Sequence, residues 1–173
     1  MSDQPYNDIL MTLGIEPGYI AERGLPVFSE ASSLVSAGPN VVGNEQKLEP
    51  ITAGQWFGMR QAAASEGVDL LLVSGFRSVE YQASLIRRKL DKGLQLPEIL
   101  AVVAPPGCSE HHTGCAVDIA TPGVPPLTEA FEETKAFAWL VKNAVKHGFS
   151  MTYPRDNPWG YDYEPWHWCR RLS

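Results

Sequence analysis

Two short polar segments, far apart in the chain, place the strongest constraint on how it can fold. The first holds His111 and Asp118, seven residues apart with Gly114 between them, and the second holds Glu164 and His167. Two imidazoles and a carboxylate suit a catalytic zinc ion, which leaves one position for water and uses a nearby carboxylate to receive the water's proton. The expected zinc ligands are therefore His111, Asp118 and His167. Glu164 is then left as the base.

Gly114 decides how His111 and Asp118 can meet. In one continuous helix they would lie two turns apart on one face, but Gly114 and the strand-like run 116–119 argue against a helix here. A loop that turns at Gly114 and enters a strand can bring both side chains toward one point. We expect His167 to reach the same point from the neighbouring strand. Any lone histidine is more often a structural residue. The combination of the two segments in one short chain favours the metal site.

The remaining histidines are interpreted as structural. His112 would point away from its neighbour His111 in an extended segment. His147 lies near the expected end of a helix, where a partial positive charge suits the helix dipole. We therefore exclude both from the site.

The cysteines are also interpreted as structural. They show no C-x-x-C zinc spacing, and we expect them to be small buried apolar residues: Cys108, Cys115 and Cys169. A Cys108–Cys115 bridge across the histidine loop stays open as an alternative. Cys115 is close to the proposed metal, but in a strand it is odd-spaced from Asp118 and faces the opposite side, so we reject it as a fourth ligand.

Length and charge limit the classes of function. A chain of 173 residues is most simply one domain with a substantial core. The net charge of −6 argues against nucleic acid as the main partner. No apolar run approaches the roughly 20 residues of a transmembrane helix, and the first residues lack a secretory signal pattern. We expect a monomer that is cytoplasmic, is exported by another route, or has lost a leader and acts in the periplasm or cell wall.

Hydrophobic periodicity predicts an α+β domain, with a small, mainly antiparallel sheet and helices packed on it. Helices are expected over 52–67, where Thr52 and Gln55 fit a capping box, and over 79–92, 97–103 and 128–148. In the last of these, Val141 and Val145 belong to the expected apolar side. Strands are expected over 68–73, 115–119, 149–153 and 163–170.

The beginning of the chain is expected to differ from the rest. Glycine and proline are dense before residue 48, which disfavours long elements. We predict an irregular arm over 1–47, packed on a catalytic domain over 48–173. A short helix over 8–13 and an extended piece at Val41-Val42 are the regular structure expected in the arm.

Three motifs carry a resemblance to a known family. Ser109-x-His111-x-x-Gly114-x-Ala116-x-Asp118, together with Glu164-Pro165-Trp166-His167, resembles the signature of VanY-type D-alanyl-D-alanine carboxypeptidases. Ser74-Gly75-Phe76-Arg77-Ser78 followed by Gln82 resembles the same family's S-G-[YF]-R-S-x-x-x-Q segment. These enzymes belong to the LAS-type zinc peptidases, with VanX dipeptidases, phage L-alanyl-D-glutamate endopeptidases and hedgehog domains. The resemblance extends over residues 48–168 and implies a hedgehog/D-Ala-D-Ala peptidase-like fold.

The resemblance also implies roles for individual residues. It implies the same zinc ligands, His111, Asp118 and His167, and the same base, Glu164. Arg77 would stabilise the oxyanion of the tetrahedral intermediate or anchor the substrate carbonyl. The substrate peptide would be held by two further residues, Gln82 and Ser109. Of the aromatic residues near the second segment, one or two are expected to line the substrate groove: Trp159, Tyr161, Tyr163, Trp166 and Trp168.

The activity that the resemblance implies is metal-assisted hydrolysis of the C-terminal D-alanine bond of peptidoglycan stem peptides. Three alternatives stay open. The site could belong to an endopeptidase that cuts between L-alanine and D-glutamate, to a cytoplasmic D,D-dipeptidase, or to a non-catalytic binding module that keeps zinc for structure. The presence of Glu164 argues against the last, because a silent site needs no base.

Overall fold

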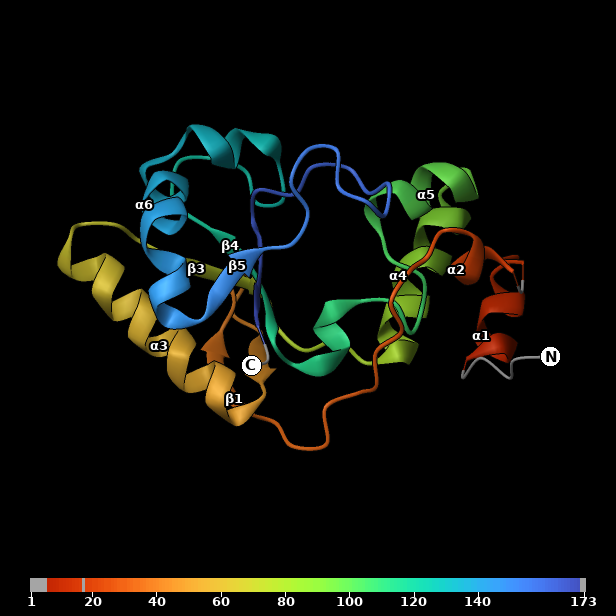
Figure 1. Ribbon diagram of the computed structural model, residues 1–173, viewed down its shortest axis with the longest axis horizontal. Helices are drawn as coiled ribbons and strands as arrows, with labels where there is room; N and C mark the ends of the chain where they lie inside the picture. The colour runs from red at the N-terminus through yellow and green to blue at the C-terminus, as the bar shows by residue number, and fades with distance from the viewer. Residues whose placement is uncertain (1–5, 17, 172–173) are drawn as a thin grey trace.

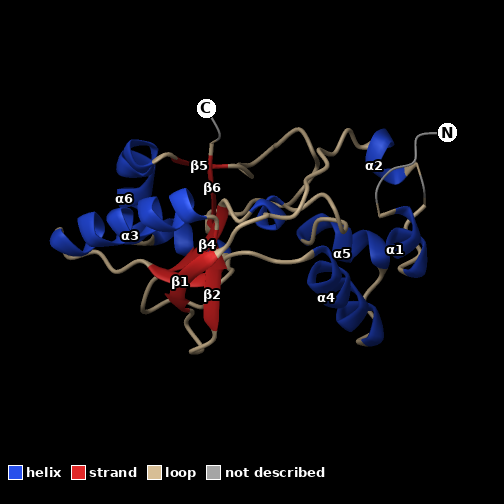
Figure 2. Cartoon of the chain, turned by 90° about the horizontal axis from the view of Figure 1, so that it is seen from below, coloured by secondary structure: helices blue, strands red, loops and turns tan. Residues whose placement is uncertain are grey.

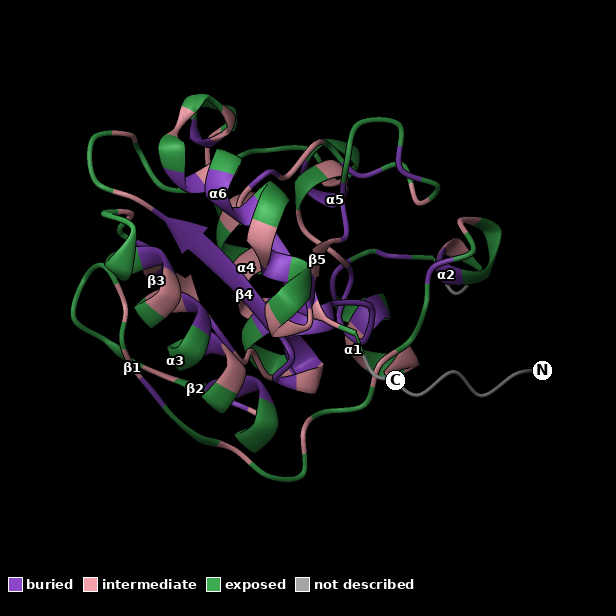
Figure 3. Ribbon diagram, turned by 60° about the vertical axis from the view of Figure 1, so that its left-hand side comes forward, coloured by how far each residue is buried: buried purple, intermediate pink, exposed green. Residues whose placement is uncertain are grey.

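A four-stranded antiparallel sheet lies in the middle of the molecule. The computed structural model describes residues 6–16 and 18–171. The strands of this sheet are β3 (Leu71–Ser74), β4 (Ala116–Ala120), β5 (Phe149–Met151) and β6 (His167–Arg170). Their order is β3-β4-β6-β5, and Figure 2 shows the strands between two groups of helices. Every residue of β4 is buried, as its purple arrow in Figure 3 shows, so Asp118 sits in an otherwise apolar strand.

Two helices cover one side of this sheet. They are α3 (Pro50–Ser65) and α6 (Lys135–Asn143), which lie together in Figure 1. The main apolar core forms between these helices and the strands, and its members include Trp56, Met59, Leu72, Ile119, Phe131, Trp139, Leu140, Phe149 and Trp168. This layer gives the strands of the site a rigid support.

Helix α3 begins earlier than the capping-box pattern predicts. Glu49, and not Thr52, is the N-cap, and its carboxylate accepts hydrogen bonds from the backbone N–H groups of Ile51 and Thr52. Pro50 follows as the first helical residue, a position that suits its fixed φ angle and missing N–H. The prediction of a cap at Thr52 was wrong because a Glu-Pro pair started the helix two residues before it.

The other group of helices packs beside the sheet. It contains α4 (Val79–Asp91) and α5 (Leu96–Val102), together with the two short N-terminal helices α1 (Asn7–Thr12) and α2 (Tyr19–Glu22). They share a second apolar cluster, whose members include Leu10, Leu13, Ile20, Ile86, Ile99, Tyr153 and Tyr161. This cluster forms the opposite wall of the region that holds the site.

The N-terminal arm is more regular than the sequence predicts. Besides α1 and α2 it contains β1 (Val35–Pro39), which pairs antiparallel with β2 (Glu45–Leu48). Val41 and Val42, expected to be extended, lie in the connection between these strands. There the Asn40 side chain accepts hydrogen bonds from the N–H groups of Val42 and Asn44 and so stabilises a turn.

The helix expected over 128–148 is divided into three pieces. They are the 3-10 helix η2 (Glu129–Glu133), α6, and the 3-10 helix η3 (Ala144–His147). Thr134 lies between η2 and α6 and interrupts the expected helix. Its extended backbone ends η2, and its hydroxyl caps α6 by accepting a hydrogen bond from Phe137 N–H. The buried residues of α6 and η3 are Ala136, Trp139, Leu140 and Ala144, which share one helical face. Val141 and Val145, expected to be apolar packing residues, lie off this face and are exposed.

The mixed helices and small antiparallel sheets confirm the predicted α+β fold class. The last strand is shorter than expected, because it contains only His167–Arg170 and residues 163–166 are not in a strand. Within residues 6–16 and 18–171, no helix has both the length and the apolar composition needed to cross a membrane.

Candidate metal centre and cleft

His111 lies on a tight turn that leads directly into β4. The turn is the 3-10 helix η1 (Glu110–Thr113), and Ser109 caps it by accepting a hydrogen bond from His111 N–H at 3.3 Å. Gly114 ends it with a positive φ of 69°, and a Cβ atom there would lie 2.8 Å from the backbone nitrogen of Glu49. Only glycine satisfies both the left-handed backbone and this close approach. The sequence therefore predicted the turn correctly, although it predicted an extended segment in place of η1.

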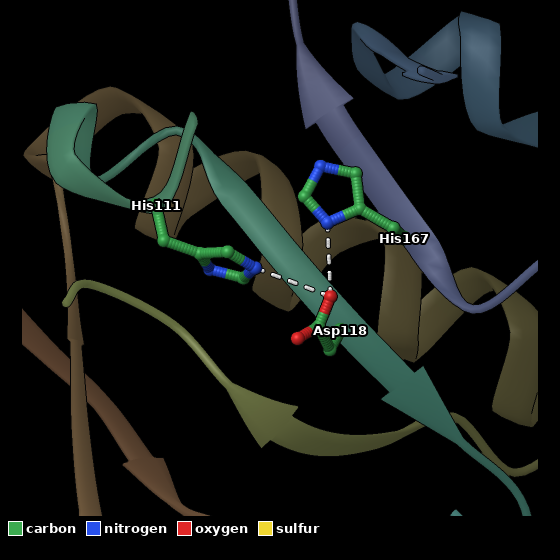
Figure 4. Close-up of side chains that lie close together, drawn as sticks. All are labelled: His111, Asp118 and His167. Carbon is green, nitrogen blue, oxygen red and sulfur yellow. Dashed lines mark hydrogen bonds and ion pairs between the residues drawn. The ribbon is translucent and has the colours of Figure 1, made fainter. Parts of the chain in front are cut away.

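Asp118 and His167 face each other across two neighbouring strands. They are direct partners in the β4–β6 pair, and Ser74 of β3 is the partner of Asp118 on the other side. Residues opposite each other in an antiparallel pair project from the same face of the sheet. His167 Nδ1 consequently lies 3.0 Å from Asp118 Oδ1, and His111 Nε2 lies 3.2 Å from the same oxygen (Figure 4).

These three side chains form a compact set of metal donors. One donor atom from each lies within 4.8 Å of the others, and all three residues are buried. The second nitrogen of each imidazole has its own partner: His111 Nδ1 lies 2.7 Å from the carbonyl oxygen of Gly75, and His167 Nε2 lies 2.9 Å from Glu110 Oε2. Such outer partners are typical of metal-binding histidines. Two imidazoles and one carboxylate fit a zinc ion with an open position.

Glu164 reaches the same place from the loop before β6. Its Oε2 lies 4.0 Å from His167 Nδ1, and 14% of its side chain is exposed. Burial disfavours the charged carboxylate, and the nearby negative charge of Asp118 adds to this, so the pKa of Glu164 is raised to about 7 against the attraction of His167. A group with this pKa can exchange a proton near neutral pH.

Arg77 enters the site from the turn between β3 and α4. Its Nε donates to Ser74 Oγ at 2.8 Å, and one Nη2 contacts the Asp118 carboxylate and lies 3.2 Å from His111 Nε2. The pKa of Asp118 is well below its usual range: burial alone would raise it, but the positive charges and hydrogen bonds of His111, Arg77 and His167 lower it. Asp118 is thus held as an anion, the form that binds a metal.

The site opens into a cleft of about 830 Å³. All seven residues proposed from the sequence line it: Arg77, Gln82, Ser109, His111, Asp118, Glu164 and His167. Of the aromatic residues near the last strand, Tyr161 and Trp166 also line it, whereas Trp168 packs in the main core. The structure therefore brings the two polar segments and the Arg77 segment to one cavity.

Two further polar residues near the ligands, His112 and Glu110, are buried, and neither is among the site residues predicted from the sequence. His112 is fully buried, with Nδ1 2.7 Å from the carbonyl oxygen of Arg77 and Nε2 accepting from Gly107 N–H at 3.1 Å. Glu110 is buried against His167. The expected structural role of His112 agrees with its contacts. The sequence analysis missed Glu110. It is next to His111 in the sequence, and no local pattern indicates that it contacts His167 instead.

The cysteines lie apart from the metal donors. All three are buried and free, so the structure does not contain the alternative Cys108–Cys115 bridge. Cys115 packs with Ala116 and Cys169 and receives a contact from Arg170 Nη2 at 3.8 Å. Its rejection as a ligand agrees with this position.

The sequence pattern of the VanY family, described as D-alanyl-D-alanine carboxypeptidase, matches residues 45–170. This range contains the sheet, the metal donors, Glu164 and Arg77. The chain belongs to the VanY family. The expected family is therefore confirmed, and the match begins at β2, three residues before the catalytic domain proposed from the sequence.

Individual VanY relatives agree with this assignment. YodJ of Bacillus subtilis, named as a carboxypeptidase, is 40% identical over 113 residues, which cover 63% of this chain and 41% of YodJ. VanXYC of Enterococcus gallinarum, named as a bifunctional D-Ala-D-Ala dipeptidase and carboxypeptidase, is 32% identical over 69% of this chain and 65% of its own length. The chain thus spans less than two thirds of these relatives.

Solved structures of the VanY group have the same fold. The LD-carboxypeptidase LdcB superposes with a TM-score of 0.72 at 33% identity, over 84% of this chain and 71% of LdcB. VanYB in complex with D-alanine-D-alanine gives a TM-score of 0.64 at 27% identity, over 84% and 80% of the two chains. A VanY variant in complex with Zn(II) gives 0.63 at 26% identity, over 84% and 82%.

Proposed function

We propose that this protein is a zinc-dependent carboxypeptidase that removes the C-terminal D-alanine from peptidoglycan stem peptides. The observation that carries the proposal is the convergence of His111, Asp118 and His167 with Glu164 in one cleft of a VanY-family domain. The solved VanY structure with Zn(II) and the VanYB structure with D-alanine-D-alanine support the choice of metal and substrate class. We further propose that residues 48–173 form the catalytic domain, that residues 1–47 pack on it, and that the protein is a monomer.

Glu164 is the proposed proton carrier. A zinc ion at the three ligands supplies a water molecule of lowered pKa and polarises the scissile carbonyl. The Glu164 carboxylate takes the proton of the attacking water and later gives it to the amine of the leaving D-alanine. Its burial and its pKa of about 7 suit both steps, because neither protonation state is strongly favoured near neutral pH.

Arg77 is the proposed electrostatic partner of the reaction. Its guanidinium lies beside Asp118 and His111 and lines the cleft. An always-charged group at this place can stabilise the negative charge that develops on the carbonyl oxygen. The hydrogen bond from Arg77 Nε to Ser74 Oγ limits how the guanidinium can turn.

Gln82 and Ser109 are the proposed holders of the peptide. Gln82 is buried and lines the cleft, and its Nε2 donates to the carbonyl oxygen of Ala104 at 2.9 Å. Among the described residues its Oε1 has no hydrogen-bond partner. A buried unpaired acceptor is costly unless a ligand satisfies it. Gln82 Oε1 can accept from a substrate N–H, and the hydroxyl of Ser109 can donate to a substrate carboxylate.

A second candidate is L,D-carboxypeptidase activity on tetrapeptide stems. It is favoured by the similarity to LdcB, which exceeds that to VanYB in both identity and TM-score. The two candidates share the metal, the base and the leaving D-alanine. They differ in the residue that precedes the scissile bond.

Mass spectrometry of defined stems tests the proposal. The purified zinc-loaded protein is incubated with pentapeptide and tetrapeptide stems and with D-alanyl-D-alanine, with and without a chelator. We expect the pentapeptide to lose one alanine, and a chelator to prevent this. Loss of alanine from the tetrapeptide alone would replace the proposed activity with L,D-carboxypeptidase activity. Cleavage of the dipeptide alone, an internal cut, or no cleavage by zinc-loaded protein would overturn it.

A further inference from the structure

Glu110 occupies the side of His167 that faces away from the cleft. Its Oε2 lies 2.9 Å from His167 Nε2, whereas His167 Nδ1 lies 3.0 Å from Asp118 Oδ1 and 4.0 Å from Glu164 Oε2. Glu110 does not line the cleft and is only 6% exposed. The two nitrogens of one imidazole therefore face different surroundings: Nδ1 faces the metal donors and the base, and Nε2 faces a buried carboxylate.

Glu110 is itself held in place from two directions. Thr152 donates its hydroxyl to Oε2 at 2.6 Å, and Arg171 donates from Nη1 to Oε1 at 3.3 Å. Arg171 also donates to Thr152 Oγ1 at 3.1 Å. These contacts determine where the carboxylate oxygen lies, so Glu110 can determine the orientation of the His167 ring.

An ion pair with Arg171 does not by itself explain why Glu110 is buried here. The Arg171 side chain is 52% exposed, and ion pairs of exposed arginines contribute little stability. Burying a carboxylate is costly unless charge or hydrogen bonds compensate. Two buried groups compensate Glu110, the hydroxyl of Thr152 and the imidazole of His167, and of these only the imidazole is a potential metal ligand.

The other histidine of the site has a different partner. His111 Nδ1 lies 2.7 Å from the neutral carbonyl oxygen of Gly75, which leaves Nε2 toward Asp118. A carboxylate partner, unlike a carbonyl, raises the basicity of the imidazole as well as fixing its tautomer. His167 is thus the ligand whose metal affinity an outer charge can adjust.

We propose that Glu110 is a positioning residue for the metal centre: its carboxylate holds the His167 proton on Nε2 and so presents Nδ1 to the metal ion. The inference rests on the proposed function only in taking His167 as a zinc ligand. It assigns Glu110 no contact with the substrate. Loss of the carboxylate weakens zinc binding, while loss of Arg171 alone leaves the Glu110–His167 contact in place.

Zinc affinity is the first test. Competition with a chromophoric chelator gives the zinc Kd of the full chain and of three variants: Glu110→Gln, Arg171→Gln and His167→Ala. Glu110→Gln keeps the size of the side chain and an acceptor oxygen but removes the charge. We expect its Kd to rise about 10- to 100-fold, the usual effect of losing such an outer partner, and Arg171→Gln to change it by less than about 3-fold. A Kd of Glu110→Gln within about 3-fold of the original would overturn the proposal.

The second test determines the tautomer of His167. It uses the original protein, so it does not depend on whether a variant folds. Long-range nitrogen–proton NMR spectra of the zinc-loaded protein report which ring nitrogen carries hydrogen. We expect Nε2–H and a zinc-bound Nδ1 for His167, and the reverse for His111. A zinc-bound Nε2 in His167 would overturn the proposal.

These readouts separate the inference from the proposed activity. If the protein binds zinc with the expected dependence on Glu110 but cleaves no stem peptide, the proposed function fails and the role of Glu110 stands. If it cleaves the pentapeptide and Glu110→Gln binds zinc as tightly as the original chain, the role of Glu110 fails and the proposed function stands.

Discussion

The carboxylate of Glu164 lies 4.0 Å from Nδ1 of His167, the same nitrogen that faces Asp118 at 3.0 Å. The proposed base and two of the proposed metal ligands therefore meet at one imidazole nitrogen, although Glu164 comes from a loop and the other two come from paired strands. If His111, Asp118 and His167 held a metal ion, Glu164 would be the carboxylate available to exchange a proton beside it.

Replacing Glu164 with Gln should abolish most turnover without loss of the metal. A positioned general base contributes about 10²- to 10⁴-fold, so we expect kcat on the pentapeptide stem to fall by that factor while zinc content stays at that of the original chain. D-alanine release and metal analysis of the same samples measure both. Glu80→Gln, an exposed residue of α4 outside the cleft, is the matched control. Loss of zinc in Glu164→Gln would mean that Glu164 is a ligand.

The same substitution should stabilise the metal-free protein, and only above acidic pH. The pKa of Glu164 is raised from 4.5 to about 7 in the folded protein. The folded state therefore retains a proton that the unfolded state releases, and the stability present below pH 4.5 is lost as the pH rises through 7. This loss is on the order of 3 kcal/mol at pH 8, and Glu164→Gln avoids it. Denaturant unfolding in chelator should show a more stable variant at pH 8 and little difference at pH 4; equal gains at both values would refute the prediction.

Arg77 should affect the chemical step more than substrate binding. Removing one donor that stabilises an oxyanion costs about 10²- to 10³-fold in kcat, and we expect this loss for Arg77→Met with a smaller change in KM. Arg77→Lys should recover only part of it, because lysine lacks the planar fork that contacts Ser74 and Asp118 together. Arg88→Met, at an exposed arginine of α4, is the control. A rise in KM at unchanged kcat would show instead that Arg77 only binds the substrate.

Gly114→Ala should destabilise the protein, whereas Gly54→Ala should not. Gly114 has a φ of 69° and no space for a Cβ atom beside Glu49, while Gly54 is exposed in α3 with nothing within 4 Å of a Cβ. A left-handed conformation costs alanine about 1–2 kcal/mol before any clash, and Gly→Ala at a compatible position stabilises by about 0.4–1 kcal/mol. Thermal unfolding should therefore show a lower Tm for Gly114→Ala and a slightly higher Tm for Gly54→Ala. Equal shifts of Tm would contradict this account of the turn.

Local sequence was sufficient to predict the structure where a single residue type determines the backbone conformation. The left-handed turn at Gly114 and the opposite facing of Cys115 and Asp118 follow from glycine's freedom and from the two-residue period of a strand. The same reasoning failed where two local preferences competed. The helix expected over 128–148 was interrupted because Thr134 serves better as a cap than as an interior helical residue.

The order of residues along the chain specifies which chemical groups are present, and its motifs alone indicate the VanY family. Only the tertiary structure decided that Glu110 meets His167 and that Arg77 meets Asp118, since both contacts join residues far apart in the chain. The first contact depends on the pairing of β4 with β6, in which Asp118 is opposite His167, and the second on the pairing of β3 with β4, in which Ser74 is opposite Asp118. A slip of one residue would turn His167 to the other face of the sheet. The raised pKa of Glu164 has the same origin, because burial is a property of the packed molecule and not of the residue.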